Sequence, residues 1–213
     1  MTVTERVVPT PYGDGRLVVH RGRSTAATLL LSHGAGNGIE ARDLAALAVG
    51  LPRQGYAVAL FEQPWRVAGK KIASAPPTLD VGLEAAARIL GARGPLVVGG
   101  RSAGARSAAR CAGRLGAVGC LALSFPLHPP GRPERSRLPE LTATGVPTLV
   151  VQGERDPMGT PEEFPEDTDV AVVPEADHGL KVPARAALTQ DEALGLVVES
   201  VLEWLVREVT GNR

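Results

Sequence analysis

The chain has few aromatic residues, no long apolar run and no excess of charge of either sign. Phe, Trp and Tyr make up 3% of its 213 residues, so small aliphatic side chains must fill the interior. Lys+Arg and Asp+Glu both number 23, so the formal net charge is zero. This balance does not suggest nucleic-acid binding, which would need clustered basic charge. A membrane span would need about 18 consecutive apolar residues, and residues 1–8 lack the apolar core of a signal peptide. We expect a cytoplasmic protein with neither nucleic-acid nor membrane partners.

Cysteine is also scarce, and the number of residues limits the number of domains. Cys111 and Cys120 are the only cysteines, one in a predicted helix and one at the start of a predicted strand. This placement favours two buried thiols over a disulfide or a metal site, and we expect no cofactor. The length fits a single domain over residues 1–213, and 44% hydrophobic residues are enough for a substantial core.

Strand-like and helix-like segments alternate along most of the chain. The predicted strands cover residues 3–8, 17–20, 27–32, 56–61, 95–98, 120–124, 148–151 and 169–173. The predicted helices cover residues 41–53, 78–90 (capped by Thr78), 102–115 and 190–206. A turn is predicted at residues 12–15, a loop at 65–77 and an irregular segment at 128–145. The alternation predicts an α/β fold: a mostly parallel eight-stranded sheet with helices on both faces and an antiparallel edge formed by the first two strands.

One motif carries the most chemistry. Residues 96–98 are apolar, residues 100–104 read Gly-Arg-Ser-Ala-Gly, and an alanine-rich segment follows. A serine between a strand and a helix sits on a sharp turn that presents its hydroxyl at the carboxyl edge of the sheet. Gly100 and Gly104 fit such a turn, because strand and helix pass too close there for a Cβ. Ser102 is therefore the candidate nucleophile, and the alternative is a glycine-rich loop with a structural serine.

A serine hydroxyl needs a base and an orienting carboxylate, which follow the serine in the order acid, then histidine. His178 lies in a loop after the last predicted strand, where a base can reach back to Ser102. His128, in the proline-rich segment, is the weaker candidate base and otherwise lines the site. For the acid we favour Asp156, just past the strand at 148–151, over the rivals Glu154 and Asp177.

Two backbone amides are expected to bind the oxyanion that forms during acyl transfer. One is the N–H of Ala103, directly after the nucleophile at a helix start. The other comes from the glycine-rich loop at residues 33–38, with Ala35 preferred and Gly34 second. This loop lacks both common nucleotide-binding glycine patterns, so a phosphate cradle is the weaker alternative.

Four local motifs together resemble the small, dienelactone-hydrolase-like α/β-hydrolases, over about residues 15–208. They are His33-Gly34-Ala35-Gly36, Gly100-Arg101-Ser102-Ala103-Gly104, Gly153-x-x-Asp156-Pro157 and Asp177-His178-Gly179. The resemblance implies a Ser-Asp-His triad of Ser102, Asp156 and His178. Residues 60–65 and 99–106, with Lys70-Lys71 and Pro76-Pro77, are similar to a narrower branch that includes a subunit of the NSL chromatin-associated acetyltransferase complex and a testis-expressed relative. Gln63 departs from that branch, which has Phe or Tyr there, and this departure changes the expected pocket wall.

The remaining residues bear on the substrate. Only a short segment separates the strands at 120–124 and 148–151, where a lid would be inserted, so we expect a small-molecule substrate in a shallow cleft. Trp65 and Phe125 are candidates for the acyl-side wall, with a core role as the alternative. Arginines at 132, 135 and 137, with Lys70 and Lys71, either hold an acidic substrate group or form a solvated surface.

Two function classes follow. The first is a serine hydrolase of a small carboxylic ester, thioester or lactone, acting through an acyl-enzyme on Ser102 as a monomer or homodimer. The second is a catalytically silent binding or scaffold protein that keeps the fold. A complete triad in the right order favours the enzyme, because a silent copy has no physical reason to retain all three groups.

Overall fold

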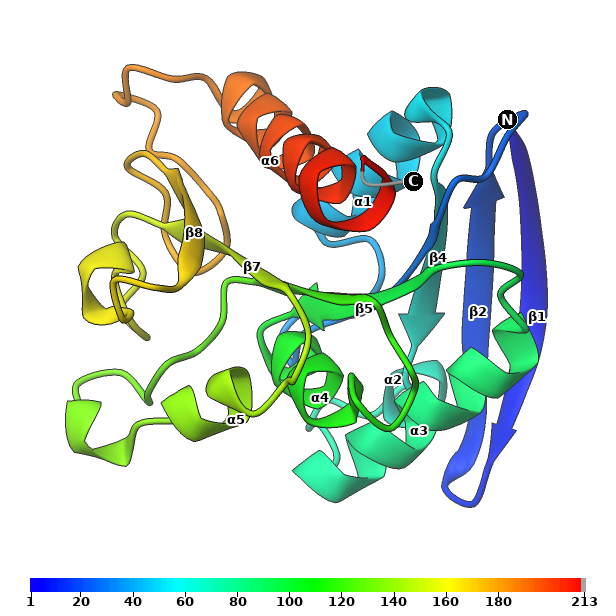
Figure 1. Ribbon diagram of the computed structural model, residues 1–213. Helices are drawn as coiled ribbons and strands as arrows, with labels where there is room; N and C mark the ends of the chain where they lie inside the picture. The colour runs from blue at the N-terminus through cyan, green and yellow to red at the C-terminus, as the bar shows by residue number, and fades with distance from the viewer. Residues whose placement is uncertain (212–213) are drawn as a thin grey trace.

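The computed structural model describes residues 1–211, and its strands form one eight-stranded sheet (Figure 1). The strands are β1 (Thr2–Thr10), β2 (Gly13–Arg21), β3 (Thr28–Ser32), β4 (Ala57–Glu62), β5 (Leu96–Arg101), β6 (Gly119–Leu123), β7 (Thr148–Gly153) and β8 (Asp169–Val173). Their order across the sheet is β1-β2-β4-β3-β5-β6-β7-β8. β2 runs antiparallel to β1 and to β4, and all other neighbours are parallel. The predicted mostly parallel sheet with an antiparallel edge is confirmed.

Helices cover both faces of this sheet. The α-helices are α1 (Arg42–Gly50), α2 (Pro64–Val67), α3 (Pro76–Leu90), α4 (Ala103–Cys111), α5 (Leu138–Thr142) and α6 (Gln190–Trp204). Short 3-10 turns are η1 (Leu51–Gln54), η2 (Pro133–Arg135) and η3 (Pro161–Glu163), and a π-helical turn, η4 (Leu205–Thr210), extends α6. In Figure 1, α1 and α6 lie together on one side of the sheet, and α3, α4 and α5 lie on the other. None of the helices within residues 1–211 combines the length and apolarity needed to cross a membrane.

The core consists of two apolar clusters, one on each face. Leu29 and Leu31 of β3 belong to the cluster under α1 and α6, whereas Leu30 belongs to the cluster under α3 and α4. This division is the two-residue period of a strand that is buried on both faces. Trp204 is the largest fully buried side chain, and alanines from α3 and α4 supply much of the second cluster. Close packing of small side chains between the helices and the sheet thus compensates for the scarcity of aromatic residues.

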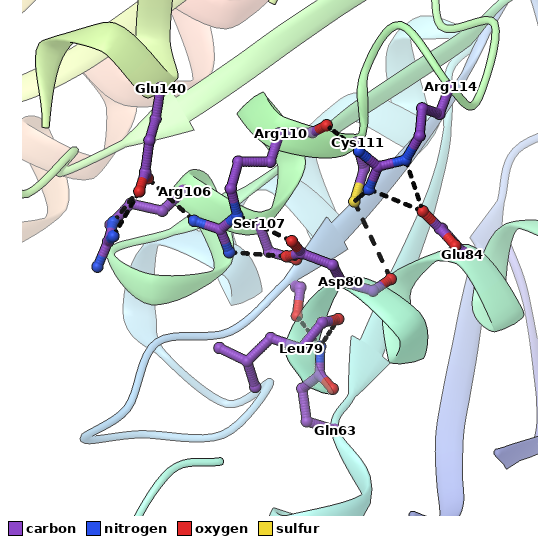
Figure 2. A network of polar contacts seen from close by, with 11 residues as sticks. Gln63, Leu79, Asp80, Glu84, Arg106, Ser107, Arg110, Cys111, Arg114 and Glu140 are labelled. Carbon is purple, nitrogen blue, oxygen red and sulfur yellow. Dashed lines mark hydrogen bonds and ion pairs between the residues drawn. The ribbon is translucent and has the colours of Figure 1, made fainter. Parts of the chain in front are cut away.

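A polar network joins α3, α4 and α5 on the second face (Figure 2). The Arg110 guanidinium donates to both oxygens of Asp80 in α3 and to Glu140 in α5, over 2.7–2.9 Å. Arg106 makes a two-point bond to Glu140 over 2.6 and 2.8 Å. Bidentate pairs of this kind fix geometry as well as charge, so α4 is held from both sides. Nothing in the sequence pattern predicted the network, because its members lie about 30 residues apart.

Several predicted boundaries are wrong in instructive ways. Thr10 pairs with Gly13, so the first hairpin turns at residues 11–12 and not at 12–15. The helix predicted at 78–90 begins at Pro76, and Thr78 lies inside it rather than capping it. Prolines suit the first helical turn, where no amide hydrogen bond is lost, and this effect outweighed the cap signal. α2 begins at Pro64 and covers the start of the loop predicted at residues 65–77, and α5 lies within the segment predicted to be irregular at 128–145.

Candidate active site

Ser102 occupies a sharp turn between β5 and α4. Its backbone has φ 53° and ψ −112°, which a side-chain-bearing residue rarely adopts. The surrounding structure holds this conformation, which costs about 1–3 kcal/mol, and the Ser102 N–H donates to the Leu123 carbonyl of β6 over 2.9 Å. The turn places the serine at the carboxyl ends of the central parallel strands.

Gly100 and Gly104 make this turn possible. A Cβ on Gly104 would overlap the Ser32 carbonyl oxygen and come within 2.7 Å of the His33 carbonyl oxygen. A Cβ on Gly100 would overlap the same Ser32 oxygen and come within 2.8 Å of the Gly104 carbonyl carbon. As predicted, neither position has room for a Cβ, and backbone atoms at the end of β3 occupy part of that space.

The structure brings together the three residues predicted to form a triad. Nε2 of His178 lies 2.9 Å from Oγ of Ser102, and Nδ1 of His178 lies 2.7 Å from Oδ2 of Asp156. The three side chains come from the segments that follow β5, β7 and β8, whose carboxyl ends reach the same edge of the sheet. An alcohol, an imidazole and a carboxylate thus form one hydrogen-bonded chain, with the geometry of a nucleophile, a base and an orienting acid.

Asp156 is fully buried and has further donors. Its Oδ1 accepts the Met158 N–H over 2.8 Å, and its Oδ2 accepts Nε2 of Gln152 over 2.9 Å. Gln152 also donates to the Gly159 carbonyl over 2.7 Å, so it ties the acid to its own loop. Gln152 was not among the predicted residues. Its signal in the sequence is a polar residue at the end of the apolar strand β7.

The weaker candidates for base and acid have other partners. His128 pairs with Glu163 through Nε2, over 2.9 Å. Glu154 accepts the Glu175 N–H over 2.6 Å, and Oδ1 of Asp177 accepts the amides of Gly179 and Lys181 within its own turn. None of these contacts reaches Ser102 or Nδ1 of His178.

The loop after β3 lies beside the serine turn. A Cβ on Gly34 would come 3.2 Å from Cβ of Ser102, so this backbone approaches the nucleophile closely. Gly34 is buried and Ala35 is exposed. Within residues 1–211 the N–H groups of Ala35 and Ala103 have no hydrogen-bond acceptor. Backbone amides that lack an acceptor, one next to the serine in the chain and one in the loop beside it, are the type of donor that binds an oxyanion.

His33 fixes the start of this loop. Its Nε2 accepts the Gln63 N–H over 3.0 Å, and its Nδ1 lies 2.7 Å from the Gly34 carbonyl oxygen, to which it donates. Burial lowers the pKa of His33 below its ordinary value, which agrees with a neutral ring that accepts at one nitrogen and donates at the other. His33 therefore connects the loop to the end of β4.

The aromatic candidates for the pocket wall are buried. Phe125 has no exposed surface and belongs to the core cluster under α3 and α4, which favours the core alternative. Trp65 is 4% exposed, and its ring packs on His33 with centroids 5.4 Å apart. Gln63 is also buried, and its side-chain amide donates to the Leu79 carbonyl over 3.0 Å (Figure 2). The Gln63 side chain thus makes an internal contact between the end of β4 and α3.

The basic residues near the site differ in their surroundings. Arg137 donates to the Pro126 carbonyl over 3.0 Å and so shapes its own loop. The other four basic residues of the prediction are exposed: Lys70, Lys71, Arg132 and Arg135.

Among the described residues, no group of three or more His, Cys, Asp or Glu side chains is placed to hold a metal ion. Cys111 and Cys120 are free and buried, as predicted.

A family model described as an alpha/beta hydrolase domain matches residues 25–206. The chain belongs to the α/β-hydrolase family. The predicted α/β-hydrolase fold is thereby confirmed. No curated protein matches the chain by sequence.

Solved structures support the same fold. A lidless α/β serine hydrolase from Xanthomonas campestris is 18% identical with a TM-score of 0.71, over 96% of this chain and 95% of that chain. A dienelactone hydrolase from Anabaena variabilis is 17% identical with a TM-score of 0.75, over 97% and 98% of the two chains. An esterase domain from Rhodothermus marinus is 15% identical with a TM-score of 0.68, over 97% and 99%. At these low sequence identities, the similarity shows a shared fold alone.

Proposed function

We propose that this α/β-hydrolase is a serine hydrolase that cleaves a small carboxylic ester, thioester or lactone through an acyl-enzyme on Ser102. The observation that carries the proposal is the continuous chain of hydrogen bonds from Ser102 through His178 to the buried Asp156. Its geometry matches what a neutral hydroxyl needs to become a nucleophile. The structural neighbours described as a serine hydrolase and an esterase domain agree with it.

In the first half of the proposed reaction, Oγ of Ser102 attacks the substrate carbonyl carbon while Nε2 of His178 accepts the hydroxyl proton. Asp156 stabilises the imidazolium that forms and keeps the Nδ1 proton pointing toward itself. The carbonyl oxygen becomes an oxyanion, which accepts hydrogen bonds from the N–H groups of Ala103 and Ala35. Collapse of this intermediate breaks the carbon–oxygen or carbon–sulfur bond, and His178 returns its proton to the leaving alcohol or thiol.

In the second half, water replaces the leaving group. His178 takes a proton from a water molecule, whose oxygen attacks the acyl carbon on Ser102. The same two amides hold the second oxyanion. When the acyl–oxygen bond to Ser102 breaks, the serine recovers its proton from His178 and a carboxylic acid leaves.

The connection between β6 and β7 supports a small substrate. It contains the 3-10 turn η2 and the five-residue helix α5, and α5 packs against α4 through Glu140. A long acyl chain would need an apolar cover, and a segment of this size supplies little of one. The narrower branch, the cytoplasmic location and the monomeric or homodimeric state stay predictions.

A fluorophosphonate probe tests the proposal directly, because it forms a covalent bond only with an activated serine. We expect the wild type to be labelled, Ser102→Ala to lose the label, and Ser24→Ala, which changes an exposed serine, to keep it. A panel of esters and thioesters of different acyl size and charge then identifies the substrate class. If the folded wild type resists both the probe and the panel, the proposal is wrong and the scaffold alternative stands.

A further inference from the structure

Arg101, the residue before the nucleophile, buries a charge beside the site. Its side chain is 7% exposed, and its Nε lies 3.0 Å from Oδ2 of Asp43, whose side chain is fully buried at the start of α1. The other oxygen of Asp43 accepts the Leu44 N–H over 3.0 Å. Burial raises the pKa of the Asp43 carboxyl, and the Arg101 guanidinium opposes that shift. An ion pair enclosed in this way is costly in desolvation, so it is weak support for stability alone.

The same guanidinium reaches the base. Nη2 of Arg101 donates to the backbone carbonyl of His178 over 2.6 Å, a short charge-assisted bond. A Cβ on Gly179 would lie 3.8 Å from Nη2, and a Cβ on Gly34 would lie 3.5 Å from Nη1. Arg101 therefore lies between the loop after β3 and the turn that carries His178, while its own backbone belongs to the serine turn.

The other bonds of the His178 turn do not reach the serine turn. Asp177 accepts the N–H groups of Gly179 and Lys181, which closes the turn on itself. Gln190 bonds to Val182 and Leu180, which fastens the following segment to α6. Among the hydrogen bonds of residues 1–211, those that join the His178 turn directly to the turn between β5 and α4 are the bond between Ser102 and His178 and the bond from Arg101.

We propose that Arg101, anchored by Asp43, is a positioning residue that sets the backbone of His178 relative to Ser102. This inference rests on the proposed hydrolase function of the same site. A planar guanidinium can bind a carboxylate and a carbonyl in two fixed directions at once, whereas a lysine ammonium is a single point of charge. Arg101 is too buried to bind substrate, so it acts on the reaction through His178.

The first test compares Arg101→Met with Arg110→Met as a matched control. Both changes remove an arginine paired with a carboxylate, but Arg110 holds Asp80 and Glu140 in the network of Figure 2. For a chromogenic acetate ester, we expect Arg101→Met to lower kcat by about 10- to 100-fold, since small misplacements of reacting groups have effects of that size. KM should stay within about twofold, because uniform binding is unaffected. Arg110→Met should lower the Tm while keeping kcat near the wild-type value.

Arg101→Lys is a second variant that keeps the test valid if Arg101→Met does not fold. It keeps a positive charge opposite Asp43 but cannot also reach the carbonyl of His178, so we expect the same loss of kcat. The concentration of competent sites is counted by fluorophosphonate titration, so that unfolded protein does not enter kcat. A folded Arg101→Lys or Arg101→Met enzyme with wild-type kcat would overturn the proposal.

A spectroscopic readout separates this inference from the proposed function. The proton between Nδ1 of His178 and Asp156 gives a low-field signal in the proton NMR spectrum when the imidazole is held in place. We expect that signal in the wild type and in Arg110→Met, and its loss or broadening in Arg101→Met. If the wild type resists the fluorophosphonate probe and hydrolyses no member of the ester and thioester panel, the proposed function fails while this signal still tests the positioning. If the signal is unchanged in folded Arg101→Met, Arg101 does not position the base.

Discussion

Nε2 of His128 lies 2.9 Å from Oε2 of Glu163, and this pair ties the loop after β6 to the loop that carries Asp156. The Nδ1 atom of His128 lies 2.9 Å from the Pro129 carbonyl, and the His128 N–H donates to the Met158 carbonyl. Hydrogen bonding to Pro129 and then to Glu163 raises the pKa of His128. The Thr160 N–H, and then His128, lower the pKa of Glu163.

This pair should make stability depend on pH. Because the folded-state pKa of His128 is raised, its contribution is present below the unfolded value of about 6.5 and is lost as the pH rises through the folded value. Because the pKa of Glu163 is lowered, its contribution is lost only as the pH falls through that depressed value. We expect His128→Gln to lower the free energy of unfolding more at about pH 6 than at about pH 9. The two losses should differ by less than about 1 kcal/mol, because the pair is partly exposed.

Urea unfolding of the wild type, His128→Gln and Glu163→Gln at several pH values measures this effect. Both variants should lose the same pH-dependent part of the stability. Curves for wild type and variants that run parallel from pH 6 to 9 would show that the pair does not titrate as described.

Ser102→Ala and His178→Ala should reduce kcat/KM to a similar extent, by at least about a thousandfold, because the residues act as one unit. Asp156→Asn should reduce kcat/KM about tenfold less than either alanine change, since the amide keeps part of the geometry around His178. Small-ester hydrolysis, with circular dichroism to verify folding, measures all three. Near-wild-type turnover in either alanine variant would end the assignment of the triad.

Gly104→Ala should destabilise the protein by about 1–3 kcal/mol, because the added methyl group meets the backbone at the end of β3. Gly195→Ala is the matched control in α6, since nothing lies within 4 Å of its added Cβ. A glycine-to-alanine change in an open helical position stabilises by about 0.5–1 kcal/mol. Urea unfolding of both variants decides the matter, and equal effects of the two changes would contradict the close approach at Gly104.

The two thiols should be unreactive in the native protein. Burial raises the pKa of Cys111 and of Cys120 to about 12, so neither forms the thiolate that reacts with disulfide reagents. We expect no colour with Ellman's reagent at about pH 8 until urea is added, and then two thiols per chain. Rapid reaction of the folded protein would show that one of these sites opens.

The sequence predicted those parts of the site that depend on local pattern and chain order. A serine between an apolar strand and an alanine-rich segment, followed by an acid and a histidine after later strands, was enough to select Ser102, Asp156 and His178. Parallel strands end at one edge of the sheet, so order along the chain becomes proximity in space.

The sequence did not predict contacts that depend on which buried groups meet. Arg101 lies within the serine motif, but its ion pair with Asp43 and its bond to His178 join three distant segments. Gln152 acts through Asp156 in the same way. Pairing of polar side chains inside a fold leaves no periodic trace, so it becomes visible only when the backbone is known.

The bond between His33 and residue 63 has a consequence for how much this loop can vary. His33 accepts the main-chain N–H of Gln63, so the contact does not depend on the side chain carried there. A side-chain change at residue 63 keeps this N–H, whereas proline, which has no N–H, would release the loop. The link between the loop after β3 and the end of β4 is thus made through a main-chain N–H, so a side-chain change at residue 63 acts on the contacts with Ser32 and Leu79 instead.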